Sequence, residues 1–354
     1  MGKEQKNSDI INAGRGRRLI RSAACLFLLI LACMAGGCTA VGGSGTGTKT
    51  KTGGKDGYPI TRDSYLLDTF CTLTIYEGGG EAAMEAAYAR LQELDALLDY
   101  NKEGSDLYRI NHREGERVEI NPDTVRLLEL GREFCDLTGG ALEPAIRPVT
   151  SLWDFKEVKK VPEREKLEEA LEQVHSQAWE VSGTEFYSED PAVRIDAGAF
   201  AKGFVADEVK QAMMDAGVTS GLINLGGNVL CLGAKPDGSP FVIAMKDPSA
   251  DNAMHYREDE LLELEDISAV TAGIYERCFE ENGVLYHHIM DPQTGYPVQN
   301  NLVSVTVTGR SSAICDALCT AIFVMGEEKG TAFLKEFNEP LESGYKAYFL
   351  RKQE

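Results

Sequence analysis

The sequence carries little positive charge for its length. Its 36 Lys and Arg residues face 56 Asp and Glu residues, which gives a formal net charge of −20 and a sequence pI near 4.8. A nucleic-acid-binding domain needs a basic face, so this balance argues against a nucleic-acid partner. It leaves room for a phosphate-bearing ligand, because a local site can differ in charge from the chain average.

A hydrophobic run long enough to span a bilayer is also missing. The apolar run AACLFLLILACMA (residues 23–35) is shorter than the ~20 residues that a membrane-spanning helix needs. Four arginines between residues 15 and 21 precede it, and small residues follow, as in an export signal. The ending AGGC resembles a bacterial lipoprotein signal, which predicts a signal peptide over 1–37 and lipidation of Cys38. The alternative is an ordinary signal cleaved nearby, with Cys38 incidental.

The residues after Cys38 have no apolar anchor. Residues 42–57, GGSGTGTKTKTGGKDG, are mostly Gly, Thr and Lys, a composition typical of a flexible spacer. We therefore expect a tether over 38–57 and one folded body over 58–354, held by its lipid anchor at the extracytoplasmic face of a bacterial cell membrane. The body shows no internal repeat and no second linker.

Cysteine offers no metal-binding pattern. Six cysteines remain in the predicted body, and an even number outside the membrane permits disulfides. Cys315 and Cys319, however, lie one helical turn apart in an apolar run, without metal-ligand partners at useful spacing. Small buried apolar side chains are the favoured interpretation.

The folded body mixes strands and helices without the regular rhythm of a doubly wound sheet. Alternation over Ser64–Tyr76 predicts a strand, and helical periodicity begins near Glu81, Asp123, Pro162 and Ser312. Further short strands are predicted around Gly226 and Gly227, at FVIAM, DISAVTA, VLYHHIM and LVSVTVT, and at the C-terminal GYKAYFL. This order predicts an α+β fold with mixed, largely antiparallel sheets and packed helices.

One helix places a carboxylate in an unusually apolar setting. Within SSAICDALCTAIFVMG (residues 311–326), Asp316 and Thr320 are four residues apart and therefore share one face. A carboxylate among apolar neighbours is costly unless it is paired or binds a metal. A carboxylate and a hydroxyl are ligands that suit Mg²⁺. Alternatively, Asp316 caps a free N–H of the first turn and Thr320 bonds back to a carbonyl.

A compact turn carries two charges. In RIDAGAFAKGFVADEV, the small residues 197–199 lie between Asp196 and Lys202, at the start of an amphipathic helix. A turn that only reverses the chain needs neither charge. Small residues together with charges indicate a backbone that approaches a charged ligand.

Three weaker signals each have a structural alternative. HHIMDPQTGYPV (287–298) sets a histidine before a Pro/Gly-rich turn, although a lone histidine is more often structural. LINLGGNV offers a double glycine for a ligand, although bulges also use glycine. TGGALEPAIRPVTSLWDF (138–155) places Glu143 and Pro144 after a helix end, and its Trp153 can equally be core.

Taken together and in this order, the motifs are specific. From about Asp68 to Gly326 the body resembles the ApbE-type FAD:protein FMN transferases, which are extracytoplasmic flavin transferases. The most diagnostic segments are TGGALEPAIRPVTSLW, IDAGAFAKGFVADEV, HHIMDPQTGYPV and VTVTGRSSAICDALCTAIFVMG. The resemblance implies a single ApbE-like catalytic body.

The resemblance also implies a reaction and its residues. FMN would pass from FAD to a Thr or Ser of an acceptor protein, AMP would be released, and Mg²⁺ would be required. By family position the metal ligands are Asp316, Thr320 and the carbonyl of Ala199. The FAD contacts are Asp196, Lys202, Ala141, Leu142, Glu143, His288 and Ile289, with weaker matches at Tyr100 and Leu67. Asp196 and His288 are both candidates to take the proton of the acceptor hydroxyl.

The chain departs from the family at two places. The family commonly has Phe-Asp-Pro-Thr where this chain has residues 142–145, Leu-Glu-Pro-Ala. It often has Met-Gly-Thr where this chain has residues 67–69, Leu-Asp-Thr.

Two other functions stay open. One is an FAD pyrophosphatase that gives FMN and AMP with water as nucleophile. The other is a surface lipoprotein that binds flavin without chemistry. An intact Asp316 and Thr320 pair favours the enzymes.

Overall fold

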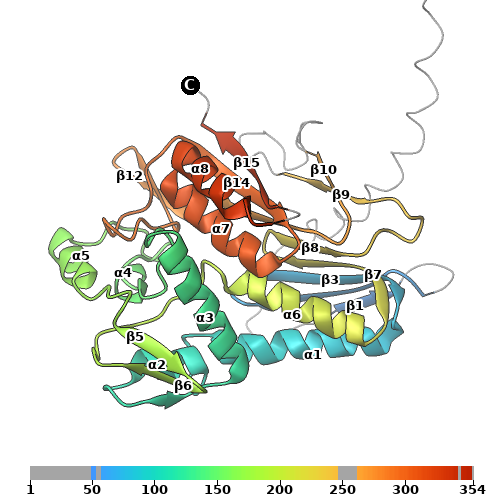
Figure 1. The fold of residues 1–354 in the computed structure, drawn as a ribbon, viewed down its shortest axis with the longest axis horizontal. Coiled ribbons are helices and arrows are strands. Elements are labelled where there is room, and N and C mark those ends of the chain that lie inside the picture. The colour runs from blue at the N-terminus through green and yellow to red at the C-terminus, as the bar shows by residue number, and fades with distance from the viewer. Residues whose placement is uncertain (1–48, 53–56, 246–260, 342–343, 353–354) are drawn as a thin grey trace, which may run out of the picture. The chain divides into compact units, whose positions relative to one another are not determined.

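The computed structural model describes residues 49–52, 57–245, 261–341 and 344–352, within one compact unit of residues 46–354 (Figure 1). The predicted signal peptide and Cys38 lie outside the described residues. In the ranges that are described, no helix has both the length and the apolar character needed to cross a membrane.

A single antiparallel sheet organises the unit. In spatial order its strands are β1 (Lys49–Thr52), β2 (Ile60–Leu66), β3 (Thr69–Gly78), β7 (Val218–Leu225), β8 (Asn228–Leu232), β11 (Ser268–Gly273), β14 (Leu302–Gly309) and β15 (Lys346–Arg351). Each neighbouring pair of these strands is antiparallel. The predicted α+β class with largely antiparallel sheets is therefore confirmed.

Smaller sheets and the helices surround this sheet. The small sheets are β4 (Val118–Glu119), β6 (Glu185–Ser188) and β5 (Trp179–Ser182); β9 (Phe241–Ala244) and β10 (Leu261–Leu264); and β12 (Cys278–Glu281) and β13 (Val284–His287). The helices are α1 (Gly80–Leu98), α2 (Asp106–His112), α3 (Pro122–Leu137), α4 (Arg147–Thr150), α5 (Arg164–Leu171), α6 (Ala201–Asp215), α7 (Ser312–Met325) and α8 (Glu327–Asn338).

The two faces of the large sheet are covered differently. Helices α1, α6 and α7 pack on one face, where Leu73, Ile223 and Val305 join the main hydrophobic core (Figure 1). Tyr76 and Leu222 belong to a second cluster with Phe241 of the β9–β10 hairpin. Residues next to each other along a strand point to opposite faces, so this alternation is what a sheet covered on both sides requires.

The first predicted strand is two strands. The run Ser64–Tyr76 breaks at Leu67 and Asp68, which join β2 to β3 in a tight turn with φ of 54° and 56°. A two-residue hairpin with positive φ at both positions matches the right-handed twist of the strands, and Asp tolerates that conformation better than most residues. The alternation continues on both sides, which is why the sequence pattern hides the turn.

Four residues of the predicted tether also belong to the sheet. Lys49–Thr52 form β1, whose residues pair with Asp63 back to Ile60 of β2. The unpaired edge of β2 offers N–H and C=O groups to any extended segment, and the threonines of β1 favour the strand conformation.

The cysteines behave as the sequence indicates. All six in the described body are free, and all but Cys278 are buried. Burial raises the pKa of Cys71 to about 11, which disfavours the reactive thiolate.

An aromatic cluster ties the segment after α4 to the β12–β13 hairpin. Trp153 is buried, stacks on Phe155 with ring centroids 5.8 Å apart, and contacts Phe279 and Tyr286. Its Nε1 donates to the carbonyl of Gly295 at 3.0 Å. Trp153 is therefore a core residue, and its packing brings the histidine segment towards the segment 138–155.

Candidate active site

The segment RIDAGAFAK is held by hydrogen bonds from two other segments. The Asn111 amide brackets Ile195, accepting from its N–H at 2.6 Å and donating to its carbonyl at 2.9 Å. The N–H of Asp196 donates to the carbonyl of Pro144 at 2.8 Å. The turn therefore has a fixed position before any ligand binds.

Both carboxylate oxygens of Asp196 have partners. Oδ1 accepts from the N–H of Gly198 at 2.9 Å, and Oδ2 accepts from the Thr150 hydroxyl at 2.6 Å. Arg147 adds a longer ionic contact of 3.8 Å to Oδ2 and lies over the Tyr100 ring, 3.9 Å from its centroid. Burial, reinforced by the charge of Asp196, raises the pKa of Tyr100. Asp196, Tyr100, Arg147 and Thr150 thus form one polar cluster.

The three predicted metal-binding groups lie where α7 packs against the start of α6. The Thr320 hydroxyl donates to the carbonyl of Ala199 at 3.2 Å. Asp316, only 5% exposed, accepts from the N–H of Gly203 at 2.8 Å. Asp316 and Thr320 do make structural hydrogen bonds, but not to the partners that the sequence suggested. Asp316 caps α6 instead of its own helix, and Thr320 reaches a carbonyl on another segment.

These groups fit Mg²⁺ by their chemistry and spacing. Octahedral Mg²⁺ with ligand distances near 2.1 Å places neighbouring ligand oxygens about 3 Å apart, close to the separation of the Thr320 and Ala199 oxygens. Burial raises the pKa of Asp316, while the nearby charge of Lys202 opposes the rise. In the part of the chain that is described, no three His, Cys, Asp or Glu side chains gather as ligands. A cation here would therefore rely on one carboxylate, neutral oxygens and the phosphates of its ligand.

Asp207 is a site-supporting residue that the sequence reasoning missed. Its carboxylate accepts from the N–H groups of Ser312 and Ala313 at 2.9 and 3.0 Å, and from the Ser311 hydroxyl at 2.8 Å. An acid on α6 thus caps α7, while Asp316 on α7 caps α6. The sequence does contain Asp207 within the predicted helix and two serines at the start of the other helix. It does not show that these residues contact each other.

The two helices touch at a glycine. A Cβ added at Gly203 would lie 2.2 Å from the Ser312 carbonyl oxygen and 2.7 Å from Cβ of Asp316. Only glycine allows α6 to approach α7 this closely. The close approach is what puts the Asp316 carboxylate within reach of the first turn of α6.

The neighbouring histidines have different environments. His287 is buried, with Nε2 2.9 Å from the Val298 carbonyl, and Nδ1 accepts from the N–H of Ile289 at 3.3 Å. His287 is thus structural, and Ile289 is a buried residue of the same turn.

His288 has a free ring nitrogen. Its backbone N–H donates to the Arg277 carbonyl at 3.1 Å, but its Nδ1 is buried without a hydrogen-bond partner. Burial, followed by the positive charges of Lys202 and Arg277, lowers the pKa of His288 to about 3. His288 is therefore neutral at physiological pH.

The segment 141–143 precedes Pro144, whose carbonyl holds Asp196, and two of its side chains are buried. Leu142 is 1% exposed, and the Glu143 carboxylate turns inward, accepting from the Ala145 N–H at 2.7 Å and from the Cys135 thiol at 3.4 Å. Ala141 is half-buried. The longer acid at Glu143 is accommodated in the interior by Cys135.

Leu67 lies in the β2–β3 turn, where its N–H donates to Asp95 at 2.6 Å.

The double glycine, in contrast, has a structural explanation. Gly226 and Gly227 form the β7–β8 turn with φ of 59° and 89°, and a Cβ at Gly226 would lie 2.0 Å from Oγ1 of Thr69.

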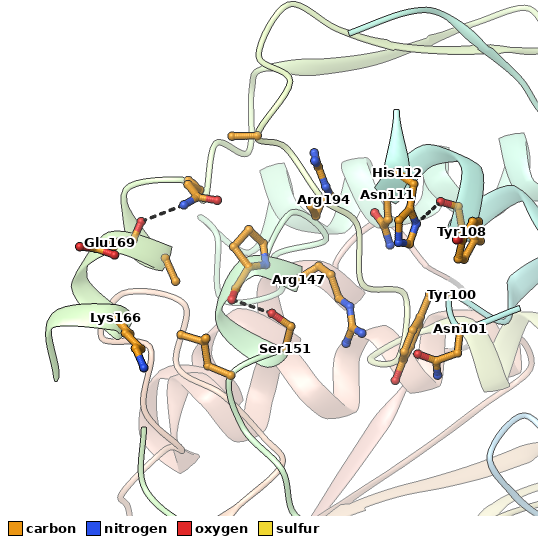
Figure 2. Close-up of a pocket in the computed structure, with 15 residues that line it drawn as sticks. Tyr100, Asn101, Tyr108, Asn111, His112, Arg147, Ser151, Lys166, Glu169 and Arg194 are labelled. Carbon is orange, nitrogen blue, oxygen red and sulfur yellow. Dashed lines mark hydrogen bonds between the residues drawn. The ribbon is translucent and has the colours of Figure 1, made fainter. Parts of the chain in front are cut away.

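A cavity of about 690 Å³ adjoins the Asp196 cluster (Figure 2). Tyr100 and Arg147 line the cavity and are also part of the Asp196 cluster. Helix α5 borders the cavity on the side opposite the stacked rings of Tyr108 and His112. None of the predicted metal groups lines it. The cavity is therefore a neighbour of the candidate site and not the site itself.

Comparisons with known proteins show the family to which this chain belongs. The ApbE family profile matches residues 67–345. An FAD:protein FMN transferase of Treponema pallidum (strain Nichols) is 33% identical over 298 residues, which cover 78% of this chain and 82% of that protein. A protein of the same name from Vibrio cholerae serotype O1 is 30% identical, with coverage of 73% and 79%.

Solved structures show the same fold. The ApbE protein of Thermotoga maritima has a TM-score of 0.73 at 29% identity, covering 82% of this chain and 93% of that one. The apo flavinyl transferase ApbE of Pseudomonas stutzeri has a TM-score of 0.71 at 26% identity, covering 87% and 92%. With the profile matching most of the sequence, this chain belongs to the ApbE family.

Proposed function

We propose that this chain is an FAD:protein FMN transferase that requires Mg²⁺. It transfers FMN from FAD to a Thr or Ser hydroxyl of an acceptor protein and releases AMP. The single observation that carries the proposal is that α7 brings a buried carboxylate and a hydroxyl against the start of α6, where Thr320 contacts the Ala199 carbonyl and Asp316 contacts the N–H of Gly203, the residue after Lys202. The Asp316 carboxylate also caps α6, but a buried charge is costly, and a bound cation would offset that cost.

The protein's groups divide the work. Asp316, Thr320 and the Ala199 carbonyl would hold the cation, and Mg²⁺ when bound neutralises phosphate charge and favours displacement at phosphorus. The ammonium group of Lys202 donates to the Gly198 carbonyl at 3.4 Å, at the turn that carries Ala199, so it can contact phosphate oxygens there. Asp196, held by Thr150 and Gly198, presents a fixed carboxylate to the nucleotide.

The reaction exchanges one bond to phosphorus for another. The acceptor hydroxyl oxygen bonds to the phosphorus of the FMN half, the phosphoanhydride bond breaks, and AMP leaves with the electron pair. Of the two candidate bases, His288 has the unpartnered Nδ1, whereas both Asp196 oxygens already accept hydrogen bonds. We therefore assign the hydroxyl proton to His288, since an adjacent phosphate anion favours its charged form.

An assay with purified full chain tests the function. Incubation with FAD, Mg²⁺ and an acceptor carrying a Ser-Gly-Ala-Thr motif should give a fluorescent protein band that survives denaturing electrophoresis, with one AMP per flavin attached. EDTA should abolish the band, and excess Mg²⁺ should restore it. Release of FMN and AMP without labelled acceptor would instead assign the chain as an FAD pyrophosphatase. Bound FAD with neither product would leave a flavin carrier.

The location is part of the same proposal. The short apolar run and the AGGC ending support attachment through Cys38 at the extracytoplasmic face of the membrane. A Cys38→Ser chain that still fractionates with membranes would contradict the anchor.

A further inference from the structure

Of the three most exposed large hydrophobic side chains in the described ranges, two flank one turn and the third lies on a loop that contacts this turn. Val158, Tyr65 and Phe70 are 68%, 62% and 55% exposed. Tyr65 and Phe70 are directly opposite each other across the β2–β3 hairpin. Val158 is two residues from Lys156, whose ammonium group contacts Asp68 in the turn of that hairpin. Clustered exposed apolar groups of this kind mark interaction sites more often than scattered ones.

Lysine and arginine side chains near these residues outnumber the acidic ones. Asp68 contacts both Lys156, at 2.5 Å, and Arg277, at 3.0 Å, so one carboxylate serves two cations. Residues 156–160, KEVKK, are all exposed and add Lys159 and Lys160, while the acids of the same loop are Glu157 and Asp154, whose carboxylate accepts from the N–H groups of residues 156–158. The chain as a whole has a net charge of −20, so this excess of positive charge around the Asp68 turn differs from the average. Such a local excess favours an acidic partner.

The same turn borders the candidate active site. Leu67 is next to Asp68, and Arg277 donates to the Asp68 carbonyl at 2.9 Å. The carbonyl of Arg277 in turn accepts from the N–H of His288 at 3.1 Å. A polypeptide bound at this corner would therefore lie close to His288.

We propose that Tyr65, Phe70, Val158, Lys159 and Lys160 form a docking face for an acidic segment of the acceptor polypeptide. The proposal rests on the proposed function, which requires an acceptor to reach His288 from outside. Aromatic anchors with a charged rim are the usual composition of an interface core and its edge. A second copy of the chain fits less well, because an isologous dimer centred here would bring two lysine-rich loops together.

Two matched peptides test the charge preference. Both carry the same Ser-Gly-Ala-Thr motif and have equal length, one flanked by Asp and Glu and the other by Lys. We expect the full chain in detergent to use the acidic peptide with a KM about tenfold lower, as a gain of about 1.4 kcal/mol would give, and with equal kcat. In Lys159→Glu/Lys160→Glu the preference should reverse, because the repulsive charge now faces the acidic peptide.

A second variant tests the apolar part. Phe70→Ser/Val158→Ser should raise the KM for both peptides about tenfold, while kcat and the Kd for FAD stay at parent values. Met214→Ser, another exposed apolar position, and Lys329→Glu/Lys335→Glu on α8 serve as controls and should behave like the parent.

The outcomes separate the two proposals. Transfer by the parent with equal KM for both peptides, unchanged in the variants, would overturn the docking face and leave the function standing. No transfer to either peptide would contradict the proposed function, and the docking face with it. A parent dimer that Phe70→Ser/Val158→Ser converts to monomer, with KM unchanged, would assign the face to self-association instead.

Discussion

The α6–α7 junction and the Asp68 turn both depend on aspartates, but the aspartates act differently. At the junction, Asp316 and Asp207 accept backbone N–H groups of the facing helix, and Gly203 leaves no space between the helices. At the turn, Asp68 pairs with Lys156, and the two side chains are 42% and 56% exposed. Buried carboxylates fix a geometry at a desolvation cost, whereas exposed ion pairs are screened and contribute little.

The difference matches the roles that we propose. A metal site must hold its ligands within tenths of an ångström, so it benefits from helices that cap each other. A docking face must adapt to another polypeptide, so solvent-exposed side chains on a turn and a loop suit it better. Three substitutions test this contrast, from the largest expected effect to the smallest.

The first substitution removes the charge at the junction without changing its shape. Asp316→Asn can still accept from the Gly203 N–H, so the protein should keep its melting temperature within about 2 °C, the shift expected for a loss below about 1 kcal/mol. Loss of the anionic ligand should lower kcat on the order of 10³-fold and weaken the dependence on Mg²⁺. Rates at several Mg²⁺ concentrations, together with a thermal melt, measure both effects. A lower melting temperature with intact Mg²⁺ dependence would make Asp316 a structural cap only.

The second substitution removes the cap of α7. Asp207→Ala leaves the N–H groups of Ser312 and Ala313 without their partner and should cost about 1–3 kcal/mol of unfolding free energy. Asp207→Asn retains an acceptor and should cost less, which makes it the matched control. Urea unfolding measures both. Equal stability of the parent and Asp207→Ala would show that water replaces the carboxylate and that α7 does not need this cap.

The third substitution addresses the exposed turn. Burial opposes the charged form of Asp68, but the hydrogen bond from Lys156 and the charge of Arg277 outweigh it and lower its pKa. Asp68 therefore stabilises the fold above its unfolded pKa near 3.9 and loses this effect as the pH falls through the folded value. Because the pair is exposed and screened, Asp68→Asn should cost only about 0–1 kcal/mol at pH 7.

Unfolding at two pH values and two salt concentrations measures the third effect. The difference between the parent and Asp68→Asn should shrink at high salt and vanish well below the folded pKa. A loss of several kcal/mol that salt does not reduce would place Asp68 with the junction aspartates and remove the contrast.

Local chemistry explains which sites were predictable. The i and i+4 spacing put Asp316 and Thr320 on one face, and the small residues 197–199 indicated a close-approach turn. The shared face follows from helix geometry, and the turn follows from the steric freedom of small side chains. Both properties depend only on residues close together in the sequence. The hairpin at Leu67 was missed because the alternation of apolar residues runs through it unbroken.

By itself, the sequence determined the α+β class, the α7 face that carries Asp316 and Thr320, and the charged turn before α6, because periodicity and turn chemistry are local. The resemblance to the family placed the Ala199 carbonyl with Thr320. Only the tertiary structure decided that Asp207 caps α7, and that His287 is satisfied while Nδ1 of His288 is free. Each of these depends on contacts between segments far apart in the chain, and the distance between such segments is set by packing, which no local pattern records.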